Sequence, residues 1–182
     1  MQENVDSKIG LDATSGDNRK AESSFLKFRG IDHIAIAVLD LEASIRFFQD
    51  VLGFELKGRS HVKGRSTGML YANLESGGIR FVLCQGTEPT SQASQLVRRN
   101  GVGVAHIALE VDNVDAAVQT LKSRGLGFDT TVVRCPGLAQ AFSSRSIETG
   151  LSFEFIHRDG ESGLLESNVQ QLFGQLEQSG KY

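Results

Sequence analysis

Two segments of this 182-residue chain repeat one pattern around a histidine. The run I-D-H-I-A-I-A-V surrounds His33, and V-A-H-I-A-L-E-V surrounds His106, which lies 73 positions later. Around each histidine the side chains alternate as they do in a strand, and the spacing of an amphipathic helix follows at once. A repeat of this size predicts two copies of one module that pair about a pseudo-twofold axis. No other feature of the sequence limits the fold as strongly.

Each copy continues with a helix and three further strands. Asp40 and Asn113 are the expected N-caps of the two helices, and Gly53 and Gly125 are expected to end them. The apolar side of the first helix carries Leu41, Ile45, Phe48 and Leu52. Strands are expected at 54–59, 67–74 and 78–85, and again at 127–133, 140–144 and 151–157. We predict an α+β fold in which two βαβββ modules, about 31–89 and 102–158, form a half-open mixed β-barrel with a cleft.

The segments outside the modules differ in character. Residues 1–24 are polar with few apolar side chains, which predicts a flexible tail before a folded domain at 25–160. A short helix is expected at 91–99, between the modules. In the last segment, 161–182, an amphipathic helix is expected to begin at Ser167.

Composition excludes several classes of function. The net charge is −3 and no basic run occurs, which argues against nucleic-acid binding. No apolar run is long enough for a membrane span or a signal peptide. Cys84 and Cys135 are isolated and are expected to be reduced thiols, which favours a cytoplasmic protein. Exposed sheet edges between the modules favour a homodimer.

Three residues on different strands form the donor set of a metal site. His33 and His106 occupy equivalent positions of the repeat, and Glu154 lies in mid-strand between two phenylalanines, where an unpaired carboxylate would be costly. When the modules are aligned on Gly78 and Gly150, Glu154 corresponds to Val82, so only one module offers a carboxylate. A lone strand histidine is usually a hydrogen-bonded core residue. Two at equivalent positions together with a glutamate favour a two-histidine, one-carboxylate triad with open coordination positions.

The repeat resembles the vicinal oxygen chelate superfamily, which groups glyoxalases, fosfomycin-resistance proteins, methylmalonyl-CoA epimerases and extradiol dioxygenases. The resemblance covers about residues 28–158. Within the superfamily, the runs S-G-G-I-R-F-V-L (76–83), R-R-N-G-V-G-V-A-H-I-A-L-E-V (98–111) and F-E-F-I-H-R-D-G (153–160) resemble 4-hydroxyphenylpyruvate dioxygenase and hydroxymandelate synthase. The run S-N-V-Q-Q-L-F-G-Q-L-E-Q (167–178) resembles the C-terminal helix that gates their active site, which implies a lid helix.

This resemblance implies a cofactor and a reaction. His33, His106 and Glu154 would bind Fe(II), with Mn(II), Co(II), Zn(II) and Ni(II) as alternatives. A small-molecule substrate such as a 2-oxo acid would chelate the metal. Dioxygen would then oxidise and decarboxylate this substrate. The expected substrate-binding residues are Arg80, Ser91, Gln92, Gln140, Phe142, Ser146 and Leu164.

Departures from the dioxygenase pattern indicate another substrate than 4-hydroxyphenylpyruvate. The chain is about half the family's length, and Thr87-Glu88-Pro89 stands where the family has Asn-Glu-Pro. Ser146 stands in place of an expected glutamine, and Leu164 lies where an aromatic residue precedes the lid helix.

Three alternatives stay open at this point. The run Q-L-V-R-R-N-G-V-G-V-A-H-I-A-L-E-V (95–111) also resembles methylmalonyl-CoA epimerases, although these usually offer a fourth donor where Val82 stands. A metal-dependent glyoxalase or lyase, or a fosfomycin-type transferase, would use a similar donor set, but the transferases have threonine at the position of Ala35. A binding protein that sequesters small molecules is disfavoured because such proteins commonly lack the triad.

Overall fold

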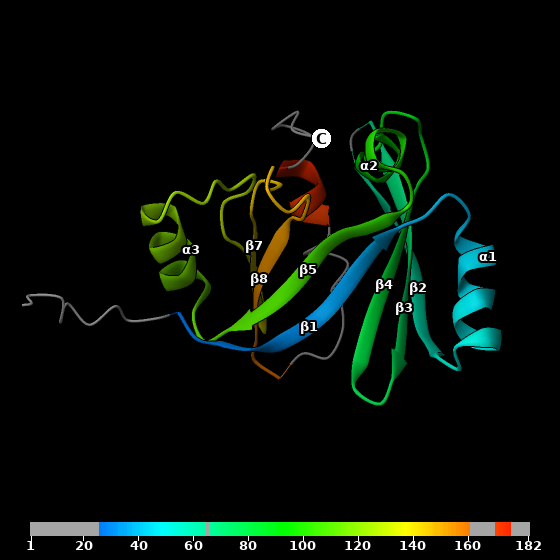
Figure 1. Cartoon of the computed structure of the whole chain (residues 1–182), viewed down its shortest axis with the longest axis horizontal. Helices are drawn as coiled ribbons and strands as arrows, with labels where there is room; N and C mark the ends of the chain where they lie inside the picture. Colours follow the sequence, from blue (N-terminus) through cyan, green and yellow to red (C-terminus); the bar gives the residue numbers. More distant parts are fainter. Residues whose placement is uncertain (1–25, 65, 161–169, 176–182) are drawn as a thin grey trace, which may run out of the picture.

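The computed structural model describes residues 26–64, 66–160 and 170–175. Eight strands form one mixed sheet in the order β2-β3-β4-β1-β5-β8-β7-β6, which curls into a half-barrel (Figure 1). The strands are β1 (Phe28–Ala37), β2 (Glu55–Lys63), β3 (Gly68–Ser76), β4 (Ile79–Gly86), β5 (Gly103–Val111), β6 (Val133–Cys135), β7 (Leu138–Phe142) and β8 (Phe153–Arg158). The predicted α+β fold of two paired modules is confirmed.

The pseudo-twofold axis is visible in the strand register. The first strands of the two modules, β1 and β5, lie antiparallel at the centre of the sheet, where His33 pairs with Ala108 and Ala35 pairs with His106. In the first module β1 runs parallel to β4 and pairs Ala35 with Val82. In the second, β5 runs parallel to β8 and pairs Ala108 with Glu154. Glu154 and Val82 therefore occupy equivalent positions, as the sequence alignment predicted.

The first helix departs from the predicted pattern near its end. Asp40 caps α1 (Leu41–Arg46) by accepting a hydrogen bond from the backbone N–H of Ala43, and the chain continues into a π-helical turn, η1 (Phe47–Val51). Phe48 is buried against the sheet, but Leu52 is 48% exposed, so Leu52 does not share the buried side of the helix with Leu41, Ile45 and Phe48 as its spacing predicted. A π-helical turn holds more residues than an α-helical turn, which rotates the next side chains away from the buried face.

The other two helices begin where the sequence predicted. Asn113 caps α3 (Val114–Ser123), which covers the outer face of β7 and β8 in the second module. Ser91 caps α2 (Gln92–Asn100), which follows β4 and stands above the end of the sheet (Figure 1). In both caps a side-chain oxygen accepts a hydrogen bond from a first-turn backbone N–H, which satisfies a donor with no partner inside the helix.

The predicted strand at 127–133 was wrong. Phe128 forms an isolated bridge with Ser143, and β6 begins at Val133. Between these points the hydroxyl of the buried Thr130 accepts a hydrogen bond from the backbone N–H of Phe142 at 2.9 Å. In a regular strand pair, a backbone carbonyl would accept this bond. When a side chain replaces the backbone as a hydrogen-bond acceptor between strands, the strand is interrupted. The alternation of apolar and polar residues in the sequence does not reveal such an interruption. β2 extends beyond the predicted end at 59 to Lys63, and His61 lies exposed within it.

Residues 170–175 form a helical segment near α2, drawn in red in Figure 1. Its Phe173 is 2% exposed and packs with Ala35, Val82 and Cys84 on the concave face of the sheet. The predicted tail at 1–24, the start of the last helix at Ser167 and the position of Leu164 lie outside the described residues.

Gly86, at the end of β4, sets how closely α2 can approach the sheet. A Cβ at this position would lie 1.9 Å from Ser91 Oγ and 2.8 Å from the backbone nitrogen of Ser94. Because backbone cannot yield as a flexible side chain can, we expect Gly86→Ala to lower the free energy of unfolding by about 1–3 kcal/mol. Urea unfolding measures this loss. Gly58→Ala is the matched control, since a Cβ there meets nothing within 4 Å. Equal effects of the two substitutions would contradict the prediction.

Candidate metal centre

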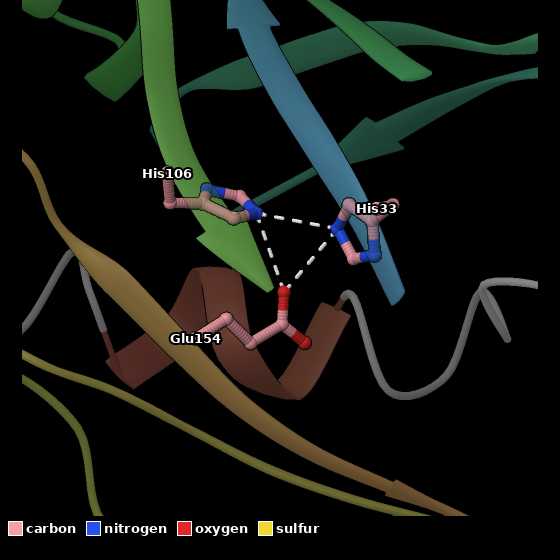
Figure 2. A group of neighbouring side chains, drawn as sticks. All are labelled: His33, His106 and Glu154. Carbon is pink, nitrogen blue, oxygen red and sulfur yellow. Dashed lines mark hydrogen bonds and ion pairs between the residues drawn. The ribbon is translucent and has the colours of Figure 1, made fainter. Parts of the chain in front are cut away.

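The side chains of His33, His106 and Glu154 converge from β1, β5 and β8 (Figure 2). The Nε2 atoms of the two histidines are 3.3 Å apart. Oε2 of Glu154 lies 3.3 Å from Nε2 of His33 and 3.2 Å from Nε2 of His106. Three strands far apart in sequence thus bring three electron-pair donors into one triangle, as expected from the repeat.

The triangle fits a divalent cation of ordinary size. Donors about 2.1 Å from an ion are about 3.0 Å apart at right angles and about 3.4 Å apart at the tetrahedral angle. The observed separations of 3.2–3.3 Å fall between these values. In addition, Oε1 of Glu154 is buried and has no hydrogen-bond partner among the described residues. A buried carboxylate oxygen without a donor is costly unless a cation accompanies it.

Burial and charge couple the three groups. Burial disfavours the protonated form of His33, but the charge of Glu154 and the hydrogen bonds to Asp32 and Glu154 outweigh burial and raise the pKa of His33. Burial likewise opposes ionisation of Glu154, yet the two histidines lower its pKa below the usual range. For His106 burial dominates and lowers the pKa. A cation that binds here therefore meets an ionised carboxylate and competes with a proton on His33.

Asp32 is bonded directly to the triad, and the sequence patterns did not single it out. Nδ1 of His33 donates to Oδ1 of Asp32 at 2.7 Å, which fixes the proton on Nδ1 and leaves the Nε2 electron pair for a ligand. Asp32 is held in turn by Arg158, through Nε to Oδ2 at 2.7 Å and Nη2 to Oδ1 at 3.0 Å. Burial opposes ionisation of Asp32, but the hydrogen bonds to His33 and Arg158 together with their charges hold its pKa well below the usual range.

A β-bulge explains why strand alternation failed at Asp32. Alternation places Asp32 and His33 on opposite faces, but the pairing of β1 with β5 shifts register between Ile31 and His33 and leaves Asp32 without a partner. Such an extra residue re-aims its side chain. A register shift at the equivalent position of β5 skips Ala105, which has no carboxylate to offer His106. The D-H dipeptide was the available signal, since an acid beside a ligating histidine is a common supporting partner.

A cavity of about 460 Å³ opens beside His106, between α2 and the helical segment at 170–175. Its wall is mostly apolar, with Met69 and Cys84 from the sheet and Leu172 and Phe173 from the helical segment. Burial raises the pKa of the Cys84 thiol to about 12, and among the described residues Cys84 is not in the group of side chains whose donor atoms converge, which consists of His33, His106 and Glu154. The volume and lining suit a small organic molecule.

Three of the predicted substrate-binding residues lie at or near this cavity. Phe142 lines it and packs edge-on against His106, with ring centroids 5.0 Å apart. Gln92 also lines it, with Nε2 buried and unpartnered among the described residues. Gln140 is 1% exposed on the strand of Phe142, two residues away and so on the same face, and neither of its amide atoms has a partner in the described part of the chain.

The other predicted substrate-binding residues are placed elsewhere. Ser91 is fully buried as the cap of α2, with its hydroxyl bonded to Ser94. Ser146 stabilises a turn by bonding Glu148 and the N–H of Thr149. Arg80 faces a separate space of about 220 Å³ behind His33, where it lies 3.5 Å from Asp32. Leu164 is outside the described residues.

The sequence profile of the glyoxalase/bleomycin resistance protein/dioxygenase superfamily matches residues 30–143, more than half of the chain. The chain belongs to this superfamily. The predicted resemblance to the vicinal oxygen chelate proteins is thereby confirmed, and residues 30–143 include both histidines of the triad.

Relatives within the superfamily have different activities. The chain is 30% identical to mitochondrial methylmalonyl-CoA epimerase of Mus musculus over 64% of its length and 65% of the epimerase. It is 25% identical to 4-hydroxyphenylpyruvate dioxygenase of Pseudomonas aeruginosa, over 89% of its length but 56% of the dioxygenase. A solved mutant of 4-hydroxymandelate synthase from Streptomyces coelicolor shares the fold with a TM-score of 0.72 at 23% identity, and the match covers 81% of this chain and 53% of the synthase.

The chain spans between about half and two thirds of the length of these relatives. Superfamily members of known activity thus include both dioxygenases and epimerases, and membership by itself does not decide between them. Across residues 26–64, 66–160 and 170–175, no helix combines the length and apolar character needed to cross a membrane.

Proposed function

We propose that this superfamily member is a non-haem Fe(II)-dependent dioxygenase acting on a small oxygen-chelating substrate such as a 2-oxo acid. The observation that carries the proposal is the convergence of two imidazoles and one carboxylate beside a cavity of about 460 Å³. Two nitrogens and one oxygen on one side of an ion suit iron in oxygenases and leave positions for a bidentate chelate and a third small ligand. Val82 at the position equivalent to Glu154 supplies no further donor.

The chain's residues would share the remaining tasks. His33, His106 and Glu154 would hold the metal, and Asp32 would keep His33 in the ligating tautomer. Phe142 would fix the ring plane of His106 by its edge-on contact. The unpartnered amide of Gln140 would donate to or accept from a substrate oxygen. Leu172 and Phe173 would exclude water from the cavity. Iron, when bound, would polarise the chelated substrate and supply electrons to dioxygen.

A metal-dependent epimerase is the second candidate function. It is favoured by the 30% identity to the mouse methylmalonyl-CoA epimerase. In such a reaction a carboxylate or other base would have to reach the carbon beside a thioester, and a metal held by His33, His106 and Glu154 would supply stabilisation of the developing negative charge. Among the described residues, Asp129 is the carboxylate that lines the cavity without belonging to the triad.

Anaerobic spectroscopy distinguishes the two candidates. The purified protein is loaded with Fe(II) and mixed with phenylpyruvate without oxygen. A visible charge-transfer band followed by oxygen uptake on aeration is expected for the dioxygenase. Deuterium exchange beside the thioester of methylmalonyl-CoA with Co(II), and no oxygen uptake, would identify the epimerase. Retention of the metal by both His33→Ala and Glu154→Ala would contradict either candidate.

A further inference from the structure

Arg145 is a half-buried cation in the cavity wall with no acidic partner. Its Nη2 donates to the carbonyl of Ala105 at 2.6 Å, and Nη1 donates to the carbonyl of Gly150. No carboxylate of the described residues forms an ion pair with it, and burial lowers its pKa. Two carbonyls fix the plane of the guanidinium but do not neutralise it. A charge removed from water and left unbalanced is costly unless a ligand compensates it.

The other charges of the cavity do not supply this compensation. Arg99, at the exposed end of α2, also lines the cavity, and its Nη2 contacts the neutral amide of Gln95 at 3.2 Å. Asp129 contributes one negative charge and accepts a hydrogen bond from Ser144 at 2.5 Å. Two arginines and one aspartate leave the wall with an excess of one positive charge.

The net charge at the metal site would be neutralised separately, by the chelating end of the substrate. A divalent cation with two neutral imidazoles and one carboxylate carries one net positive charge. A monoanionic chelate such as the keto-carboxylate of a 2-oxo acid cancels it. The excess at Arg145 and Arg99 would then remain for a different group of the same molecule. Because arginine binds carboxylates and phosphates through paired N–H donors, an anion suits this position better than a neutral polar group.

We propose that the substrate carries a second anionic group beyond the oxygens that chelate the metal, and that Arg145 binds this group, with Arg99 attracting it from the rim. This inference rests on the proposed function of the triad as a metal site for a chelating substrate. It narrows the substrate class to organic dianions, which carry a chelating end and a second charged group.

The test compares two acids of equal chain length. The Co(II)-loaded protein is titrated with 2-oxoadipate, which has a distal carboxylate, and with 2-oxohexanoate, which ends in a methyl group, and the visible Co(II) spectrum reports binding. We expect 2-oxoadipate to bind about 10-fold or more tightly, since hydrogen bonds to charged groups contribute about 1.5–3 kcal/mol. Arg145→Gln should abolish this preference and leave the dissociation constant of 2-oxohexanoate unchanged.

Controls separate recognition from a purely structural role of Arg145. If the two carbonyl contacts only anchored the loop, Arg145→Gln would lower the melting temperature and weaken both acids equally, which would overturn the inference. Arg99→Gln should reduce the preference in part. Arg98→Gln should not, because Arg98 is exposed on the same helix and does not line the cavity. Equal binding of both acids by the unmodified protein would overturn the inference alone. A Co(II) spectrum that responds to neither acid would overturn both the inference and the proposed function.

Discussion

Glu154→Gln is expected to weaken binding of a divalent cation by at least about 100-fold while the protein stays folded. Glutamine keeps the size of the side chain, so the packing on the face of β8 that Glu154 shares with Ile156 is preserved. It replaces the single anionic ligand of the triad with a neutral amide, and hard divalent cations bind carboxylates far better than amides. Isothermal titration with Co(II) measures the loss, and circular dichroism confirms that the fold is retained.

The matched control for this substitution is Glu110→Gln. Glu110 also lies on a central strand of the second module, but it faces Arg29 at 3.7 Å, outside the triad. We expect the cobalt affinity of Glu110→Gln to equal that of the unmodified protein. Unchanged affinity in Glu154→Gln would show that the three donors do not act as one site.

Asp32→Asn is expected to impair both stability and metal binding. It removes the negative charge that Asp32 places beside the guanidinium of Arg158, which is 11% exposed, and breaking a buried ion pair in this way costs about 3–5 kcal/mol. The amide also no longer compels His33 to keep its proton on Nδ1. Loss of such a supporting partner typically lowers metal affinity about 10–100-fold. Urea unfolding measures the first effect, and cobalt titration at a temperature where the variant is folded measures the second.

The stability difference should depend on pH in a defined direction. Because folding lowers the pKa of Asp32, its ionised form stabilises the protein above about pH 4, the usual range of a carboxyl group. This contribution declines as the pH falls towards the folded pKa, so Asp32→Asn and the unmodified protein should converge in acid. Asp112→Asn is the control, since the exposed pair of Asp112 and Arg29 contributes at most about 1 kcal/mol. A nitrogen-15 spectrum of His33 that shows the same tautomer in Asp32→Asn would contradict the positioning role.

Residues near one another in sequence were well predicted where the physics is local. The predicted caps Asp40 and Asn113 accept hydrogen bonds from backbone N–H groups three residues ahead, so a short window contains all the interacting groups. The repeat itself could also be predicted, because it aligns the two modules residue by residue. The correspondence of Val82 with Glu154 followed from this and agrees with the pairing of strands.

Where an irregular hydrogen bond replaces the regular pattern of a strand or an α-helix, the sequence was insufficient. The stretch 127–133 has the alternation of a strand, but a hydrogen bond from the backbone of β7 to Thr130 interrupts it. The position of Leu52 likewise depended on a π-helical turn that apolar spacing does not show.

By itself the sequence determined the duplicated architecture and the three residues whose donor atoms meet, because periodicity and repeat symmetry indicate the strand face on which His33, His106 and Glu154 lie. Only the tertiary structure decided what surrounds them. The partnership of Asp32 with Arg158 joins residues 126 positions apart and requires a bulge in β1. The position of the Arg145 charge in the cavity wall follows only from the folded structure, which brings distant segments together around the cavity. Electrostatic balance depends on distance in space, and no spacing along the chain encodes it.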